Sequence, residues 1–268
     1  MPLYQALTAS DPFFLIAGPC VIEEEHLMLS TAEFLKTLCL RLQLPLVFKS
    51  SFSKANRSSI SSPTGPGLDR GLRILHRIRT EFNLPVLTDV HECSEVAPVA
   101  EVCDILQIPA FLSRQTALIQ AAAASGRIVN IKKGQFMAPE DMAAAAAKAE
   151  AAGNTQILLT ERGSSFGYHN LVVDFRGFAI MHQTGYPVVY DLTHSLQRPS
   201  SGTSTGGNPE FAPMMARAAI ATDMLKGLFI ECHPRPSEAQ SDASTMLALD
   251  ALEPILQRCI EICQTKEL

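Results

Sequence analysis

The sequence predicts an α/β protein built as a single (β/α)8 barrel, the TIM-barrel class. The chain has 268 residues, of which 47% are hydrophobic and 18% are charged, so one large core is within reach. Strand-like and helix-like segments alternate along its whole length, and no change in composition divides it. We therefore expect one barrel domain over residues 1–268.

Eight short apolar runs are typical of buried strands of a parallel sheet. We expect them at 12–20, 44–51, 85–92, 104–110, 127–134, 156–163, 187–194 and 227–234. Helix-like segments lie between and after them at 24–42, 68–82, 94–102, 114–125, 139–152, 171–183, 209–225 and 246–264. Eight such units in about 250 residues favour a closed barrel. A doubly wound open sheet is the alternative, but no GxGxxG follows the first strand.

Charge and cysteine content exclude several classes of protein. A net charge of −5 argues against a general nucleic-acid binder. The sequence has no apolar run long enough to cross a bilayer, and no basic segment precedes the first apolar run at 13–17. The seven cysteines are odd in number and scattered, so a disulfide framework is not expected. We expect a cytoplasmic protein without a membrane partner.

The stretch 47–59, VFKSSFSKANRSS, is a strand that runs into a cationic loop. Lys49, Lys54 and Arg57 lie among five serines, and Asn56 adds an amide. Cations and hydroxyls that converge in one loop suit a ligand rich in phosphate or carboxylate oxygens. The alternative is a solvated loop with scattered basic residues.

Polar and ionisable residues stand at the end of every predicted strand. In chain order they are Cys20, Lys49, Asp89 and His91, Gln107 and Ala110, Lys132 and Lys133, Arg162, Asp191 and His194, and Glu231 and His233. In a barrel these ends share the face on which active sites are built. The placement therefore predicts a site at the carboxyl ends of the strands.

Two chemical groups separate among these residues. The cations come from strands 2, 5 and 6 and their loops, and they suit one or two phosphates; they are Lys49, Lys54, Arg57, Lys132 and Arg162. Cys20, His194 and Glu231 come from strands 1, 7 and 8, which become neighbours when the barrel closes. Thiolate, imidazole and carboxylate together suit Zn²⁺ or Fe²⁺, and Asp242 can supply a fourth ligand.

Each metal candidate also has a simpler interpretation. Cys20 alone suits a small buried apolar side chain, and His194 alone suits a polar residue at a strand end. Glu231 follows three apolar residues, and a buried carboxylate there needs a partner. The stretch 199–210, PSSGTSTGGNPE, reads as a mobile loop over the site or as an idle surface loop.

Eight motifs of the chain carry a family resemblance. The motifs are IAGPC (16–20), FKSSFSKANRSS (48–59), TDVHE (88–92), QIPAFLSRQT (107–116), NIKKGQF (130–136), LTERGSSFGYHNLVVD (159–174), DLTHS (191–195) and ECHPRPSEAQSDAST (231–245). Together, in order and over nearly the whole chain, they resemble the 3-deoxy-D-manno-octulosonate 8-phosphate synthases. GPC is shared with the sister 3-deoxy-arabino-heptulosonate 7-phosphate synthases, whereas KANRSS is more specific.

The resemblance implies a transferase reaction. Phosphoenolpyruvate would condense with arabinose 5-phosphate and water, giving the eight-carbon sugar acid phosphate for lipopolysaccharide synthesis and inorganic phosphate. Metal-independent family members carry Asn in the first motif, whereas this chain has Cys20, so it resembles the metal-dependent class. Cys20, His194, Glu231 and Asp242 match the metal ligands. Zn²⁺, Fe²⁺ or Mn²⁺ is implied, as is a homotetramer.

The resemblance also implies roles for individual residues. Those that match the phosphoenolpyruvate site are Lys49, Ser51, Lys54, Gln107, Ala110, Lys132 and Arg162. Those that match the arabinose 5-phosphate site are Asn56, Arg57, Ser58 and Asp89. The implied catalytic residues are Lys54, His194 and Asp89. The chain departs from the family at Asn208–Pro209, where a basic residue often follows the paired glycines.

Two rival functions stay open. One is the sister synthase, which uses erythrose 4-phosphate. The other is an inert barrel that binds sugar phosphates or metal as a sensor. Within the enzyme hypothesis, a lysine Schiff base is the competing covalent mechanism.

Overall fold

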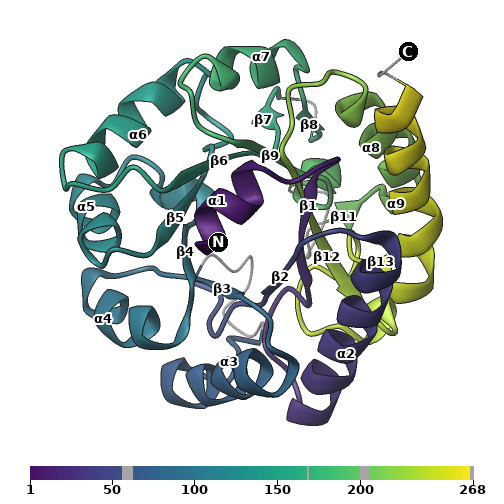
Figure 1. Ribbon diagram of the computed structural model, residues 1–268, viewed down its shortest axis with the longest axis horizontal. Coiled ribbons are helices and arrows are strands. Elements are labelled where there is room, and N and C mark those ends of the chain that lie inside the picture. Colours follow the sequence, from purple (N-terminus) through teal and green to yellow (C-terminus); the bar gives the residue numbers. More distant parts are fainter. Residues whose placement is uncertain (56–62, 168, 200–205, 266–268) are drawn as a thin grey trace.

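The computed structural model describes residues 1–55, 63–167, 169–199 and 206–265. In this part of the chain, eight parallel strands form a closed barrel surrounded by helices (Figure 1). The barrel strands are β1 (Phe14–Gly18), β2 (Leu46–Lys49), β3 (Val86–Asp89), β4 (Ile105–Ile108), β5 (Ile128–Lys132), β6 (Ile157–Glu161), β9 (Val188–Asp191) and β12 (Gly227–His233). β1 pairs with both β2 and β12, which closes the ring and confirms the predicted fold class.

The helices of the outer layer follow the predicted segments. The helix predicted at 68–82 has those bounds, the one predicted at 94–102 begins one residue earlier, and the others are shorter than predicted. They are α2 (Glu25–Leu42), α3 (Leu68–Phe82), α4 (Cys93–Val102), α5 (Thr116–Ala124), α6 (Asp141–Glu150), α7 (Arg176–His182), α8 (Ala212–Ile220) and α9 (Leu249–Gln264). None of the helices in the described ranges combines the length and apolarity needed to span a bilayer.

Each barrel strand alternates between two cores with a period of two residues. On β1, Phe14 and Ile16 face the barrel interior, whereas Leu15 and Ala17 pack toward the helices. Both sets are fully or almost fully buried, which explains why the strands read as continuous apolar runs.

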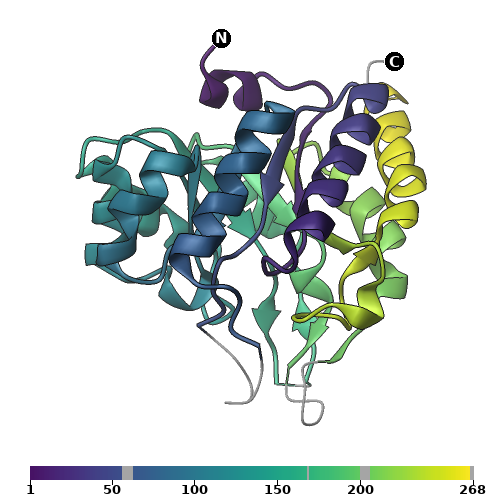
Figure 2. The same cartoon turned by 90° about the horizontal axis from the view of Figure 1, so that it is seen from below.

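The first helix, α1 (Leu3–Thr8), lies outside all the predicted segments. It lies across the amino-terminal end of the barrel, as the side view in Figure 2 shows. Leu7 is buried there, and Leu3 and Tyr4 pack on the same inner cluster. The Tyr4 hydroxyl donates to the backbone carbonyl of Ile157, 3.2 Å away. α1 therefore closes the end of the barrel that is remote from the predicted site.

The βα loops carry further short elements at the other end. β7 (Ser164–Ser165) pairs with β8 (Leu171–Val172), and β10 (Gln197–Arg198) pairs with β11 (Gly206–Gly207). These hairpins interrupt the predicted helix 171–183 and the predicted loop 199–210. Residues 200–205 of that loop lie outside the described residues, so its expected motion stays a prediction.

Gly18 allows β1 and β2 to approach closely at the functional end. A Cβ atom at this position would lie 2.0 Å from the backbone oxygen of Lys49. Real Cβ atoms do not come so close to a carbonyl, so a side chain here would push the two strands apart. The glycine of the IAGPC motif thus fixes Cys20 beside the end of β2.

Candidate active site

A belt of polar side chains crosses the barrel interior above the apolar layer. Ser51 and Gln107 donate to the two carboxylate oxygens of Asp89. Asn130 Nδ2 donates to Gln107 Oε1 over 2.8 Å, and Thr160 Oγ1 donates to Asn130 Oδ1 over 2.6 Å. All five side chains are buried, so their polar groups satisfy one another. The belt holds Asp89 and Gln107 rigidly at the floor of the site.

A pocket opens above this belt at the carboxyl ends of the strands. Among the described residues that line it are four cationic side chains: Lys49, Lys54, Lys132 and Arg162. Asp89, Gln107, Ala110, His194 and Glu231 also line it. This excess of cations over carboxylates suits an anionic ligand.

Arg162 is 4% exposed, and its guanidinium contributes to this pocket. Its Nη2 donates to Gln197 Oε1 over 2.7 Å. Within the described part of the chain, its buried Nη1 has no hydrogen-bond partner. Burial lowers the pKa of Arg162, although nearby carboxylates, Asp191 foremost, oppose the shift. A buried donor without a partner is costly unless a ligand accepts from it.

Lys132 and Lys49 are held by buried carboxylates. Lys132 Nζ lies 2.6 Å from Asp191 Oδ2 and 3.8 Å from the centroid of the Phe229 ring. Lys49 Nζ lies 2.5 Å from Glu231 Oε1 and donates to the carbonyl of Cys20 over 2.9 Å. The predicted cation group and the predicted metal-ligand group are therefore in contact, because Lys49 forms an ion pair with Glu231.

The pKa values of Asp89 and Lys54 favour their charged forms. Burial alone would raise the pKa of Asp89, but the charges of Lys49 and Lys54 lower it below its ordinary value. Burial alone would lower the pKa of Lys54, but the acidic groups around it, including Cys20 and Glu231, raise it well above its ordinary value. Lys54 Nζ donates to Ser51 Oγ over 3.2 Å. It therefore stays an ammonium group beside the belt.

Three of the four predicted metal ligands form one compact group. One ligand atom from each of Cys20, Glu231 and Asp242 lies within 4.8 Å of the others. The Cys20 thiol donates to Asp242 Oδ2 over 2.9 Å. Burial, with the nearby charges of Asp242 and Glu231, raises the pKa of this thiol well above its ordinary value.

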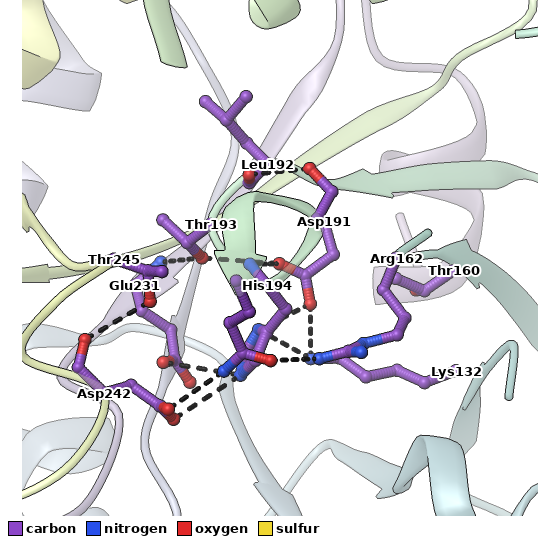
Figure 3. Close-up of polar contacts among 12 residues, drawn as sticks. Lys132, Thr160, Arg162, Asp191, Leu192, Thr193, His194, Glu231, Asp242 and Thr245 are labelled. Atoms are coloured by element: carbon purple, nitrogen blue, oxygen red, sulfur yellow. Dashed lines mark hydrogen bonds and ion pairs between the residues drawn. The ribbon is translucent and has the colours of Figure 1, made fainter. Parts of the chain in front are cut away.

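His194 borders this group, and Asp191 orients it (Figure 3). His194 Nδ1 lies 2.7 Å from Asp191 Oδ2, and the His194 backbone N–H donates to Asp191 Oδ1 over 3.0 Å. The other ring nitrogen, Nε2, lies 3.5 Å from Glu231 Oε2 and 3.8 Å from Asp242 Oδ2. A carboxylate that holds one nitrogen of a histidine while the other faces acidic ligands is typical of metal centres.

The residues present fit a divalent cation. Glu231 Oε2 is buried and accepts no hydrogen bond from the described residues. A thiol, an imidazole and two carboxylates that converge there form a donor set suited to Zn²⁺ or Fe²⁺. A cation at this point would compensate the clustered acidic groups.

The structure thus brings most of the predicted site together. Six of the seven residues predicted for phosphoenolpyruvate line the pocket: Lys49, Lys54, Gln107, Ala110, Lys132 and Arg162. The seventh, Ser51, contacts Asp89 and Lys54. Of the residues predicted for arabinose 5-phosphate, Asp89 lines the pocket, whereas Asn56, Arg57 and Ser58 lie outside the described residues.

Several residues of the site have no role predicted from the sequence. Asp191 was noted only as a strand end, although its place three residues before His194 is a usable signal. Gln197 and Gln135, which also lie at the pocket or its wall, had no signal. Lys133 was grouped with Lys132 but faces away from the pocket, where its Nζ lies 3.4 Å from Glu161 Oε1 and 2.9 Å from Ser164 Oγ.

Known proteins resemble this chain over most of its length. Proteins named 2-dehydro-3-deoxyphosphooctonate aldolase match it at 57% identity in Acidithiobacillus ferrooxidans and at 54% in Granulibacter bethesdensis; each match covers 92% of this chain and 88% of the relative. One of the same name in Legionella pneumophila is 54% identical, covering 92% of this chain and 90% of the relative. The DAHP synthetase I family matches residues 6–266. This chain belongs to the DAHP synthetase I family.

Proposed function

We propose that this chain condenses phosphoenolpyruvate with D-arabinose 5-phosphate and water, giving 3-deoxy-D-manno-octulosonate 8-phosphate and inorganic phosphate. The relatives' printed name, 2-dehydro-3-deoxyphosphooctonate aldolase, refers to the same eight-carbon acid phosphate. The family description points to the sister heptulosonate reaction instead. We favour the octulosonate product because the relatives that carry its name are 53–57% identical to this chain.

One observation of the site carries the proposal. A single pocket combines four cationic side chains of the described residues with a neighbouring thiol, imidazole and carboxylate group. The cations suit the phosphate and carboxylate of phosphoenolpyruvate, because they neutralise its charge and fix its orientation. Arg162 supports this assignment best, since its buried Nη1 lacks a partner among the described residues.

The bond changes of the reaction define what the residues must do. The methylene carbon of phosphoenolpyruvate forms a bond to the aldehyde carbon of the sugar, whose oxygen gains a proton. Water adds to the second carbon of phosphoenolpyruvate and loses a proton. The bond between that carbon and the phosphate oxygen then breaks as the added hydroxyl becomes the ketone carbonyl; the hydroxyl's remaining proton passes to the departing inorganic phosphate.

Lys54 is the proposed proton donor to the aldehyde oxygen. It is an ammonium group at the pocket, and Ser51 holds it beside Asp89. Asp89 is suited to accept hydrogen bonds from sugar hydroxyls, because it stays ionised. His194 and the other proposed ligands, Cys20, Glu231 and Asp242, would hold a divalent cation. That ion would supply positive charge and fixed coordination, as an organising centre for sugar or water oxygens.

A phosphate-release assay tests the function. We expect phosphate from phosphoenolpyruvate with arabinose 5-phosphate, and far less with erythrose 4-phosphate. The reverse preference would establish the sister reaction. Binding of phosphoenolpyruvate with no turnover of either sugar would support the inert sensor. A lysine adduct trapped by borohydride in the presence of substrate would replace the proposed mechanism with a Schiff-base mechanism.

Chelation tests the metal. We expect the chelated wild-type protein to lose activity and to recover it with Zn²⁺, Fe²⁺ or Mn²⁺. Cys20→Ala should lose activity, whereas Cys20→Asn should keep some activity after chelation, as the resemblance to metal-independent relatives implies. Full activity of the chelated, metal-free wild type would reject the metal. A homotetramer and a cytoplasmic location belong to the same proposal, and sedimentation and cell fractionation test them.

A further inference from the structure

Gln197 lies between the two halves of the site and contacts both. Its side-chain Oε1 accepts from Arg162 Nη2 over 2.7 Å, and its Nε2 donates to Asp242 Oδ1 over 2.9 Å. Arg162 belongs to the proposed anion site, and Asp242 belongs to the proposed metal site. One amide therefore joins a group that directly follows β6 to a group in the loop after β12.

The chemistry of the two partners requires a group that both accepts and donates. A guanidinium can only donate hydrogen bonds, and an ionised carboxylate can only accept them. A primary amide offers one acceptor and one donor, and the two partners together set its orientation. Glutamine thus satisfies both neighbours at once without adding charge to the site.

Gln197 contacts one terminal atom of each partner and makes no contact with the other terminal atom. It engages Nη2 of Arg162, and the buried Nη1 is left without a partner in the described part of the chain. It engages Oδ1 of Asp242, and Oδ2 is left on the side of Cys20 and His194, 2.9 Å from Sγ and 3.8 Å from Nε2.

The backbone around Gln197 is well placed for this role. Gln197 follows the short 3-10 turn His194–Leu196, so it lies three residues after a proposed metal ligand. It pairs with Gly207 in the β10–β11 hairpin. A Cβ atom at Gly207 would lie 2.2 Å from Thr245 Cγ2, so the hairpin packs directly on the loop that carries Asp242.

We propose that Gln197 is a positioning residue that sets the guanidinium of Arg162 for the anion and the carboxylate of Asp242 for the metal. The inference rests on the proposed function for the identity of the anion and the metal. The inference adds that the anion site and the metal site depend on the same side chain, that of Gln197. Loss of the Gln197 amide should therefore lower the affinity of the protein for two different ligands.

Gln197→Met tests the proposal, because methionine has a similar length but neither donates nor accepts as the amide does. We expect the affinity of the chelated protein for phosphoenolpyruvate to fall about 10-fold, measured by calorimetry, as loss of a charge-assisted contact would give. We expect the affinity for Co²⁺ to fall ~10–100-fold, followed by the thiolate-to-cobalt absorption band. Gln183→Met, at an exposed glutamine, is the matched control and should change neither.

The same substitution in an Asp242→Ala variant distinguishes a positioning role of Gln197 from a general loss of folded structure. In Asp242→Ala, the further change Gln197→Met should no longer weaken Co²⁺ binding but should still weaken phosphoenolpyruvate binding, because only the Arg162 contact remains to be lost. If Gln197→Met lowers the melting temperature and leaves both affinities unchanged, the proposal is wrong. If the wild type binds neither phosphoenolpyruvate nor Co²⁺, the proposed function itself fails, which is a distinguishable result.

Discussion

The two ends of the barrel interior are built from the same strands and have opposite chemistry. At the end near α1, the inward side chains are apolar: Phe14, Ile16, Val47, Leu87, Ile105, Ile128, Leu158, Val189 and Phe229. Two or four residues further along these strands, the inward positions carry charges, amides and a hydroxyl: Lys49, Asp89, Gln107, Asn130, Lys132, Thr160, Asp191 and Glu231. Most barrel strands thus contribute an apolar side chain to the core at their amino-terminal end and a polar side chain to the site at their carboxyl end.

The two ends differ in whether their inward side chains need hydrogen-bond or ion-pair partners. The apolar end needs only close packing, and α1 completes it with Leu7. At the functional end, the charged groups are held by neighbours on other strands, and some atoms, such as Arg162 Nη1 and Glu231 Oε2, lack hydrogen-bond partners in the described ranges. Such atoms are costly in the free protein and are suited to bind ligands. Mutations at the apolar end should therefore change stability alone, whereas mutations at the functional end should change both stability and ligand binding.

The largest effect is expected from Lys49→Met at the functional end. Lys49 and Glu231 are each 1% exposed, so the variant would leave a buried carboxylate without its cation. Removing one partner of a buried pair costs about 3–5 kcal/mol. Urea unfolding of the chelated protein should show this loss, and the double variant Lys49→Met with Glu231→Gln should recover part of it. Equal stability of the single and double variants would contradict the pairing.

Leu7→Ala tests the apolar end. The side chain is 1% exposed inside the closed end of the barrel, and its truncation should cost about 3 kcal/mol of unfolding free energy. Because α1 is remote from the pocket, kcat and KM of the folded enzyme should stay within about twofold. Gln5→Ala, at an exposed position of the same helix, is the control. A large loss of kcat at a temperature where Leu7→Ala is fully folded would show that the two ends are not separable.

How far the sequence predicted these two ends can be judged residue by residue. Lys49, Asp89, Gln107, Lys132 and Glu231 were expected to share one face because they end predicted parallel strands, and all five line the pocket. Position at a strand end did not separate Lys132 from Lys133, because both follow the same apolar run. The alternation of side chains along the strand sends them to opposite sides.

The missed elements share a physical cause, which is that tertiary contacts decide them. α1 has six residues and no side-chain cap, so its stability comes from packing on the barrel. Gln197 acts through partners 35 and 45 residues away, and local sequence cannot report such distances. Asn56, Arg57 and Ser58 stay predictions, because they lie outside the described residues.

Asp89→Asn should have an intermediate, pH-dependent effect. The pKa of Asp89 is lowered in the folded protein, because Lys49 and Lys54 outweigh the effect of burial. Its ionised form therefore stabilises the fold above the unfolded pKa of about 4, and this contribution is lost as the pH falls toward the lower folded pKa. We expect the variant to lose about 2 kcal/mol at pH 7.

The pH profile of unfolding checks this sign. The difference in stability between wild type and Asp89→Asn should shrink on acidification below about pH 4. Asp69→Asn, at an exposed position of α3, should show no such trend. A difference that stays constant down to pH 3 would mean that the ionised carboxylate is not what Asp89 contributes.

The smallest effect is expected outside the barrel. Arg77 pairs with Glu25 over 2.8 Å and with Glu81 over 2.9 Å, but all three side chains are about half exposed. Exposed pairs contribute ~0.2–1 kcal/mol and are screened by salt. Arg77→Ala should therefore change the unfolding free energy by less than about 1 kcal/mol, with no change at 1 M NaCl. A larger loss would mean that these surface ion pairs contribute as much to the unfolding free energy as residues at either end of the barrel.

The pairing of β1 with β12 also has a consequence for biosynthesis. The contact between Cys20 and Asp242 joins positions 222 residues apart, and it requires that the last strand has docked beside the first. A nascent chain whose last strand, β12, is still inside the ribosome cannot bring Cys20, Glu231 and Asp242 together. The proposed metal site would then be complete only after translation has delivered all eight barrel strands.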